Sequence, residues 1–298
     1  MKNNIQYYSN TAFNRAVTSR EMPTTLKQAS TSFVLYNNGV FLQNAQRKIY
    51  FDFIPEDFIE KVERPYFLGK IEAIEIYCLD LSTLSEDILK KLPKHHSFQL
   101  KEASFLNTED AALLAYAQGL LIWNQRHIYC GTCGSKTKSI QQGHSRKCPT
   151  CASINFPRID PAVIVLIEYK RAQQKPLCLL NMHPLEDGYR CSLFSGFVEI
   201  GESLEDAAIR EMQEEVDLKV HNIQYQASQP WPFPATMMIG LKAESSHLDF
   251  TVDNDEIKEA RWFSPQELQQ MVENKKIIIS KESSISKFLI EAWLKEHL

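Results

Sequence analysis

The sequence predicts an N-terminal α+β domain, a small cysteine-rich module and a C-terminal α/β/α sandwich with a mixed sheet. Its 298 residues are enough for two ordinary domains. Four of the seven cysteines fall in two CxxC pairs near the middle of the chain. The second half alternates strand-like apolar segments with helical patterns, which indicates a sheet with helices on both faces.

The first part of the chain shows the pattern of an α+β domain. Strands are expected at residues 32–36, 40–42 and 71–81, and a helix is expected at residues 111–123. The first two strands flank Asn and Gly at 37–39, residues that favour a tight hairpin turn. Thr108 is expected to open the helix, with acidic residues at its positive end. We place this domain at residues 1–125.

The second half has the pattern of a sheet sandwiched between helices. Strands are expected at residues 162–169, 177–181, 220–226, 237–243 and 259–263, and an amphipathic helix at 284–297. An acidic helix follows a glycine-led loop that begins at Gly196. We place this domain at residues 156–298.

The two CxxC pairs predict a structural zinc site between the domains, at residues 126–155. Four thiolates at this spacing can close a tetrahedron around Zn²⁺ and leave no open coordination position. A disulfide or a redox pair is less favoured, because two matched pairs in a reducing compartment are better explained by one metal. The ligands would be Cys130, Cys133, Cys148 and Cys151.

A nucleic-acid-binding module is the competing interpretation of the cysteine pairs, because zinc ribbons often bind nucleic acids. The segment has a basic character from Lys136, Lys138, His144, Arg146 and Lys147. However, the segment lacks the aromatic residues expected of a platform for single strands. The basic residues would then be merely solvated.

The bulk properties predict a cytoplasmic protein that does not interact with membranes. The net charge of −4 gives no general attraction to nucleic acid or to an anionic membrane. The longest purely apolar run, residues 162–167, is far too short to cross a bilayer. The N-terminal residues lack the basic start and apolar core of a secretory signal. The single cysteines Cys78, Cys178 and Cys191 are expected to be small buried hydrophobes.

Three glutamates are expected to share one face of the acidic helix. Glu211, Glu214 and Glu215 lie three and four residues apart, which is the spacing of helical neighbours. Crowded carboxylates repel one another, so without a cation they would cost helix stability. A divalent metal would remove this conflict, and Mg²⁺ or Mn²⁺ suits a site built of carboxylate oxygens. The alternative is an ordinary solvated acidic helix.

A proline-rich segment follows the acidic helix and predicts a rigid loop at residues 228–236. Three prolines alternate with two aromatic residues, which stiffens the backbone and holds flat rings in place at low entropic cost. Such a loop suits recognition of a nucleobase, although a surface turn with its aromatics in the core fits the composition equally well. The residues concerned are Gln229, Pro230, Trp231, Pro232, Phe233, Pro234, Ala235 and Thr236.

The acidic segment resembles the Nudix box. The matching positions are Gly196, Glu202, Arg210, Glu211, Met212, Glu214, Glu215 and Leu218. Asp217 stands where the family has glycine at the helix exit, which we interpret as a local cost because Asp tolerates positive φ. The later SQPWPFP segment and the FPRIDPAVI segment at 156–164 resemble the NADH pyrophosphatase branch of Nudix hydrolases, which also has a four-cysteine zinc site. The resemblance covers residues 108–294.

This resemblance implies hydrolysis of the pyrophosphate of NADH or NAD to nicotinamide mononucleotide and AMP. It also makes removal of NAD caps from RNA plausible, and it leaves ADP-ribose and dinucleoside polyphosphates as alternative substrates. It implies that Phe156 and Phe197 pack against the nicotinamide-side base and that residues 229–236 line the nucleotide pocket. Without the resemblance, core packing of both phenylalanines would be preferred. It further implies a homodimer in which the partner chain helps to complete the pocket.

Glu211 and Glu215 are the first choices for Mg²⁺ or Mn²⁺ ligands, with Glu214 supplementing them. The resemblance adds the carbonyl of Ser195 and the carboxylate of Glu256, although Glu256 could also be a plain surface acid. Either Glu256 or a helix glutamate could orient or deprotonate the attacking water. We expect Arg210 to anchor the loop by pairing with an acid such as Glu202.

Overall fold

The computed structural model describes residues 7–9, 13–16, 20, 30–62, 65–280 and 283–298. Two compact units make up this described chain. One contains residues 159–231 and 236–298, and the other contains residues 7–158 and 232–235. Each unit is described below by itself.

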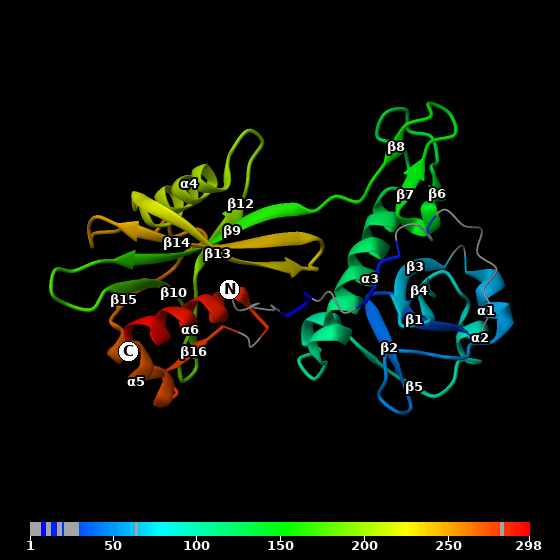
Figure 1. The fold of residues 1–298 in the computed structure, drawn as a ribbon, viewed down its shortest axis with the longest axis horizontal. Helices are drawn as coiled ribbons and strands as arrows, with labels where there is room; N and C mark the ends of the chain where they lie inside the picture. The colour runs from blue at the N-terminus through cyan, green and yellow to red at the C-terminus, as the bar shows by residue number, and fades with distance from the viewer. Residues whose placement is uncertain (1–6, 10–12, 17–19, 21–29, 63–64, 281–282) are drawn as a thin grey trace. The chain divides into compact units, whose positions relative to one another are not determined.

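A five-stranded sheet forms the centre of the N-terminal unit (Figure 1). The strand order is β3-β4-β1-β2-β5, and the β1–β4 pair is parallel while the other pairs are antiparallel. Phe33 of β1 and Phe67 of β3 are fully buried in one core together with Phe58 of α1 (Glu56–Lys61). The strands are β1 (Thr31–Asn37), β2 (Val40–Asn44), β3 (Tyr66–Ile71), β4 (Ile74–Asp80) and β5 (His95–Phe98), and a short helix α2 (Glu86–Leu89) precedes β5.

The predicted hairpin is confirmed, and the predicted strand at 71–81 is wrong at its start. Asn38 and Gly39 connect β1 to β2 with φ angles of 44° and 92°, the left-handed conformation that these two residue types adopt most easily. Ile71 ends β3 instead of opening a strand, because the chain turns at Glu72, whose φ is 53°. The next strand therefore begins at Ile74.

The long helix α3 (Thr108–Arg126) was expected from its apolar residues, but its N-cap is Asn107 and not Thr108. The Asn107 side chain accepts a hydrogen bond from the backbone N–H of Asp110 at 2.8 Å. Most of the helix is buried, which explains its weak amphipathic pattern. It leads directly into a three-stranded ribbon made of β6 (Lys138–Ile140), β7 (Ser145–Lys147) and β8 (Ile154–Asn155).

An eight-stranded mixed sheet forms the second unit. Its path is β13-β14-β9-β10-β11-β16, with β12 paired to β9 and β15 paired to β10. The β14–β9 pair is parallel over ten residues, from Thr236 opposite Asp160 to Ser245 opposite Tyr169. The strands are β9 (Asp160–Tyr169), β10 (Leu177–Leu185), β11 (Gly188–Ser192), β12 (Phe194–Phe197), β13 (Val220–Trp231), β14 (Thr236–Ser245), β15 (Ala260–Phe263) and β16 (Ile277–Ile279).

Helices cover both faces of this sheet, as predicted for an α/β/α sandwich (Figure 1). On one face, α4 (Leu204–Val216) buries Met212 and Val216 against sheet residues such as Val163. On the other, α5 (Pro265–Glu273) and α6 (Ile285–His297) bury Leu268 and Trp293 in a separate core. The expected terminal helix is confirmed, with Ser284 as its N-cap.

The predicted rigid loop at 228–236 is mostly wrong as a loop. Residues 228–231 continue β13, and Thr236 already belongs to β14, so only residues 232–235 form the turn. Trp231 lies directly opposite Thr236 in the antiparallel ladder. Prolines are rare inside strands, so the pattern predicts an early strand end, but prolines are tolerated at the tip of a hairpin.

Candidate active site and zinc site

The acidic helix α4 is firmly capped at both ends. Ser203 and Asp206 form a capping box, in which each side chain accepts a hydrogen bond from the other residue's backbone N–H. At the exit, Asp217 adopts the left-handed conformation with φ 52° and ψ 37°. Asp217 therefore takes the backbone conformation for which glycine is usually needed, and the helix ends where the sequence predicted.

Arg210 binds three glutamates and the loop before the helix. Its guanidinium donates two hydrogen bonds to Glu202, at 2.6 and 2.9 Å, and one to the Phe197 carbonyl at 2.9 Å. It also donates to Glu211 at 2.8 Å and to Glu214 at 3.1 Å. The hydrogen bonds from Arg210 lower the pKa of Glu202 to about 2. The predicted pairing of Arg210 with Glu202 is confirmed, and it fixes the loop against the helix.

Glu215 is a buried carboxylate that forms no ion pair with any residue that the structure describes. Its Oε2 atom is buried and has no hydrogen-bond partner within the described residues. Burial first, and then the charges of Glu211, Glu256 and Asp253, raise its pKa to about 8. An orphaned oxygen among like charges is the arrangement that a hard divalent cation would stabilise. The residues present therefore fit a magnesium or manganese ion.

The loop before β15 brings two further acids to this face of the second unit. Asp253 donates its backbone N–H to the Glu215 carbonyl at 3.1 Å, which ties the loop to the end of α4. The Asp253 carboxylate accepts the backbone N–H groups of Ile257 and Glu256, at 2.9 and 3.1 Å. Glu256 itself is exposed. The sequence reasoning singled out Glu256 and missed Asp253, although the acidic run at 253–256 could have indicated both.

The predicted metal ligands lie in one region, but they do not form a closed cage. Glu211 and Glu215 are buried, whereas the Glu214 side chain is 61% exposed and Ser195 is exposed on β12. Across the described residues, no three of these carboxylates bring ligand oxygens within 4.8 Å of one another. A cation held by three of these carboxylates would therefore require their side chains to rotate.

The two phenylalanines expected near the base are exposed, so core packing is wrong for both. Phe156 is 57% exposed in the N-terminal unit, and Phe197 is 59% exposed at the end of β12 in the second unit. An exposed phenylalanine ring costs free energy in water unless a ligand or a partner covers it.

The residues at 229–236 divide into an inward-facing strand end and an anchored turn. The Gln229 amide is buried and donates to the Ser283 carbonyl while accepting from the Ile285 N–H, so it holds the start of α6. In the turn, the Pro232 carbonyl accepts a hydrogen bond from the Gln118 side chain of α3 at 2.5 Å. The Phe233 ring meets Tyr8 edge to face at 5.9 Å.

The four paired cysteines form one cluster that fits Zn²⁺. Cys130 and Cys151 have their sulfurs 3.6 Å apart, and those of Cys133 and Cys148 are 3.5 Å apart. Four sulfurs at ~2.3 Å from one zinc ion would be about 3.8 Å apart, close to what is observed. All seven cysteines, each in the described chain, are free, which excludes the disulfide alternative here. Hydrogen bonding by Ser153 lowers the pKa of Cys130 to about 5 and so favours the thiolate.

The ribbon differs from the basic, aromatic-poor surface that the sequence suggested. His144 and Arg146 are buried, and Arg146 donates to Asn124 and Thr137. These two residues therefore build the module and cannot contact a ligand at its surface. Conversely, Tyr129 is 67% exposed and lies opposite Lys136, so the ribbon does present an aromatic ring beside a cation.

Comparison with known proteins gives matches to both modules. The NUDIX domain family matches residues 158–281, and the NADH pyrophosphatase zinc ribbon domain matches residues 125–156. The human NAD-capped RNA hydrolase NUDT12 is 33% identical over 64% of this chain and 43% of its own length. NAD-capped RNA hydrolase NudC is 32% identical in Pseudomonas fluorescens, over 78% of each chain, and 32% identical in Pseudomonas entomophila, over 82% of this chain and 84% of the relative.

The fold and the two sites thus define a Nudix protein with a zinc ribbon. The chain belongs to the Nudix family, in the branch that carries the NADH pyrophosphatase zinc ribbon. It spans less than half the length of the human relative. Among the described helices, none has the length and apolar character needed to cross a membrane.

Proposed function

We propose that the protein hydrolyses the pyrophosphate of NADH or NAD, giving nicotinamide mononucleotide and AMP, and that it removes NAD caps from RNA. The observation that carries this proposal is the buried Oε2 of Glu215, which lies near Glu211, Asp253 and Glu256 and has no hydrogen-bond partner in the described part of the chain. The names of the relatives, NAD-capped RNA hydrolases, support the choice of substrate. NAD contains a diphosphate bridge, which is the group that such an acidic metal site would bind.

Mg²⁺ or Mn²⁺, held by Glu211, Glu215 and Glu256 with Glu214 and the Ser195 carbonyl, would offset the charge of the diphosphate and stabilise the leaving phosphate. Arg210 keeps the loop that begins at Phe197 in place through its bonds to Glu202. Glu256 or one of the helix glutamates orients or deprotonates the attacking water. The raised pKa of Glu215 means that cation binding must displace its proton near neutral pH.

We further propose that Phe156, Phe197 and the turn at 232–235 contact the dinucleotide. The exposed rings offer flat apolar surfaces for a base, and the Gln118 hydrogen bond keeps the turn in one conformation. A homodimer would cover these rings together with Ile200, which is fully exposed. The free cysteines favour a cytoplasmic location, since thiols stay reduced there.

A substrate panel with product identification tests the proposed activity. NADH, NAD, ADP-ribose and a dinucleoside polyphosphate are incubated with Mg²⁺, and the products are identified by mass. We expect AMP and nicotinamide mononucleotide from NADH or NAD at the highest kcat/KM. A higher kcat/KM for ADP-ribose or the dinucleoside polyphosphate would assign a different Nudix specificity.

The Glu215→Gln variant links this activity to the acidic site. It should lower kcat by about 10²-fold or more, since a neutral amide cannot replace a charged ligand. Glu205→Gln is the matched control, because Glu205 is an exposed glutamate in the first turn of the same helix. Full activity of Glu215→Gln with an intact fold would contradict the proposed site.

A further inference from the structure

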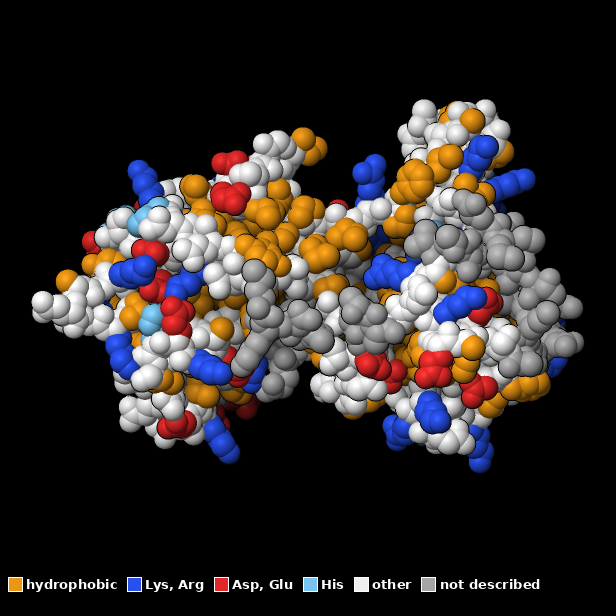
Figure 2. Space-filling model, in the orientation of Figure 1, with side chains coloured by type: hydrophobic (Ala, Val, Ile, Leu, Met, Phe, Trp, Pro, Cys, Tyr) orange, Lys and Arg blue, Asp and Glu red, His pale blue; other side chains and the backbone are white. Residues whose placement is uncertain are grey.

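The ribbon segment is strongly basic in a chain whose net charge is negative. Between Arg126 and Arg158 the sequence has three lysines and three arginines but neither Asp nor Glu, whereas the whole chain has a net charge of −4. Four thiolates around one Zn²⁺ form a cluster with a net negative charge, which offsets only part of the positive charge of this segment. Figure 2 shows Lys or Arg side chains on the surface of this module. The segment is therefore suited to a polyanion.

Two lysines, Lys138 and Lys147, form a cross-strand pair on one face of the ribbon, called the lysine row below. Lys138 on β6 lies directly opposite Lys147 on β7, and Lys147 lies opposite Ile154 on β8. Cross-strand partners point to the same face, and like charges in this position destabilise a sheet. Both lysines are exposed, and neither makes an ion pair with an acid of the described chain. An external anion would remove the repulsion.

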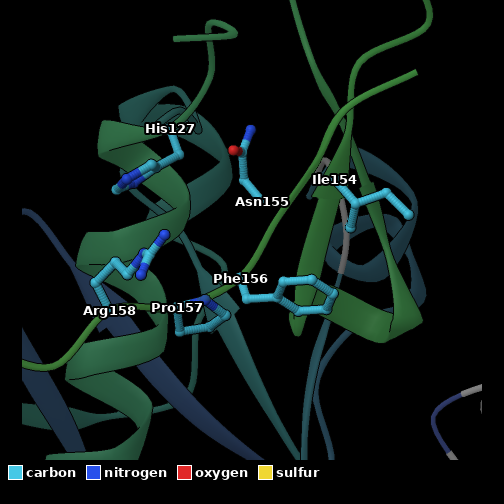
Figure 3. Close-up of a pocket in the computed structure, with 6 residues that line it drawn as sticks. All are labelled: His127, Ile154, Asn155, Phe156, Pro157 and Arg158. Carbon is cyan, nitrogen blue, oxygen red and sulfur yellow. The ribbon is translucent and has the colours of Figure 1, made fainter. Parts of the chain in front are cut away.

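A pocket of about 190 Å³ lies beside this row, between the end of α3 and the strand that leaves the ribbon (Figure 3). His127, Asn155 and Arg158 lie toward one side of it, and Ile154 and Phe156 extend toward the other. Its volume is below the roughly 300–1,000 Å³ of pockets that enclose whole small ligands. The pocket is therefore suited to one nucleotide unit and not to a complete dinucleotide.

The polar side of the pocket is arranged for a ribose phosphate. His127 donates from Nδ1 to the Trp123 carbonyl at 2.7 Å and stacks on the Trp123 ring, which fixes the imidazole. Its Nε2 is then an acceptor for a hydroxyl group. Arg158 and Asn155 have side-chain donors that make no hydrogen bond within the described residues, and a guanidinium suits a phosphate.

We propose that the lysine row and the polar side of this pocket bind the single-stranded RNA that follows the cap. The inference rests on the proposed removal of NAD caps from RNA. Lys138 and Lys147 contact backbone phosphates, and Arg158, Asn155 and His127 hold one ribose phosphate. The ribbon also carries the exposed ring of Tyr129, opposite Lys136, on which a base can stack. An aromatic ring next to a cation distinguishes the ribbon from a merely solvated basic segment.

RNA binding by the full-length protein tests the proposal directly. Fluorescence anisotropy is measured without divalent metal, on an NAD-capped RNA of about ten nucleotides and on the same RNA with a 5′-monophosphate. The variants are Lys138→Ser with Lys147→Ser, and Arg158→Gln. The control removes three exposed lysines elsewhere in the same unit, by Lys48→Ser, Lys94→Ser and Lys101→Ser.

We expect each ribbon variant to weaken binding of both RNAs by about tenfold at low salt. The slope of log K against log salt should become shallower by about 0.7 for each phosphate that the variant no longer neutralises. The control should bind as the wild type does. Hydrolysis of free NAD by the variant that combines Lys138→Ser with Lys147→Ser should keep the wild-type kcat/KM, while its KM for capped RNA rises.

Unchanged RNA binding in the ribbon variants would overturn the proposal. An equal loss of kcat/KM on free NAD and on capped RNA would also overturn it, because the pocket would then belong to the dinucleotide. A change of oligomeric state in the variants would overturn it as well, because this face would then be a contact between copies of the chain. If the wild type cleaves neither NAD nor capped RNA, the proposed function fails, and the binding experiment still decides whether the ribbon holds RNA.

Discussion

Glu211 lies so close to Gly196 that any side chain at position 196 would have to displace the Glu211 carboxylate. A Cβ atom on Gly196 would be 1.8 Å from the Glu211 carboxyl carbon and 1.9 and 2.1 Å from its two oxygens. These distances are far inside van der Waals contact. The glycine at the end of β12 therefore lets the first proposed metal ligand lie directly on the backbone of the sheet.

Gly196→Ala should displace the Glu211 carboxylate and lower kcat for NADH by about 10²-fold, because a shift of about 1 Å in a catalytic group can cost that much. The measurement is steady-state hydrolysis with Mg²⁺ at saturating substrate. Gly119→Ala is the control, since a Cβ there meets no atom within 4 Å. Equal activity of the two variants would show that the position of Glu211 is unimportant.

Position 217, now Asp217, should accept glycine more readily than any β-branched residue. Its φ of 52° lies in the left-handed region, which costs non-glycine residues roughly 1 kcal/mol and β-branched residues more. Asp217→Gly should leave the free energy of unfolding unchanged or raise it by up to ~1 kcal/mol, and Asp217→Val should lower it by about 1–2 kcal/mol. Urea unfolding checks both values. A Val variant as stable as the Gly variant would contradict the strain argument.

Buried His144 should make the protein less stable in acid. Burial lowers its pKa from the ordinary 6.5 to about 4, against the hydrogen bond of its Nε2 with the Phe67 carbonyl at 2.7 Å. The unfolded chain takes up the proton first, so this stability is present above pH 6.5 and is lost as the pH falls toward 4. The loss should approach roughly 3 kcal/mol.

The difference between wild type and His144→Gln isolates this contribution to the pH dependence. The variant retains a donor for Phe67 but cannot titrate, so its free energy of unfolding should fall less steeply between pH 7 and about 4.5. Protonation of the zinc thiolates affects both proteins alike and cancels in the comparison. Parallel pH profiles would mean that His144 is not buried in its neutral form.

Removal of zinc should unfold the ribbon without destroying the catalytic sheet. The ribbon strands are only two or three residues long, so they depend on the metal for their stability. Cys148→Ser, at a fully buried ligand, should abolish binding of one zinc per chain, as measured by atomic absorption. Cys78→Ser, at a buried cysteine outside the cluster, should retain the zinc. Equal zinc content in both variants would reject the four-cysteine site.

The elements that sequence reasoning predicted well are those with strong local signals. Asn38 and Gly39 determine their hairpin by backbone conformation alone, and the helix exit at Asp217 follows the same logic. The spacing of Glu211 and Glu215 predicted one helical face, and the cysteine pairs predicted one cluster. Each of these features depends on residues close together in the chain.

The features that the sequence did not predict depend on distant contacts. Asp253 approaches Glu215 only because a loop returns from the far end of β14, and Gln118 reaches Pro232 across more than one hundred positions. Burial of Arg146 required knowledge of Asn124 and Thr137 as its partners. The proline-rich segment was misassigned because its prolines lie at a strand end, where pairing with β14 continues to Trp231.

Location of bound Mn²⁺ by anomalous scattering from a crystal soaked in the ion tests the central claim most directly. We predict a peak bounded by carboxylate oxygens of Glu211 and Glu215, absent from crystals of Glu215→Gln. An active crystalline enzyme whose Mn²⁺ lies elsewhere, with these two carboxylates empty and turned apart, would contradict the account.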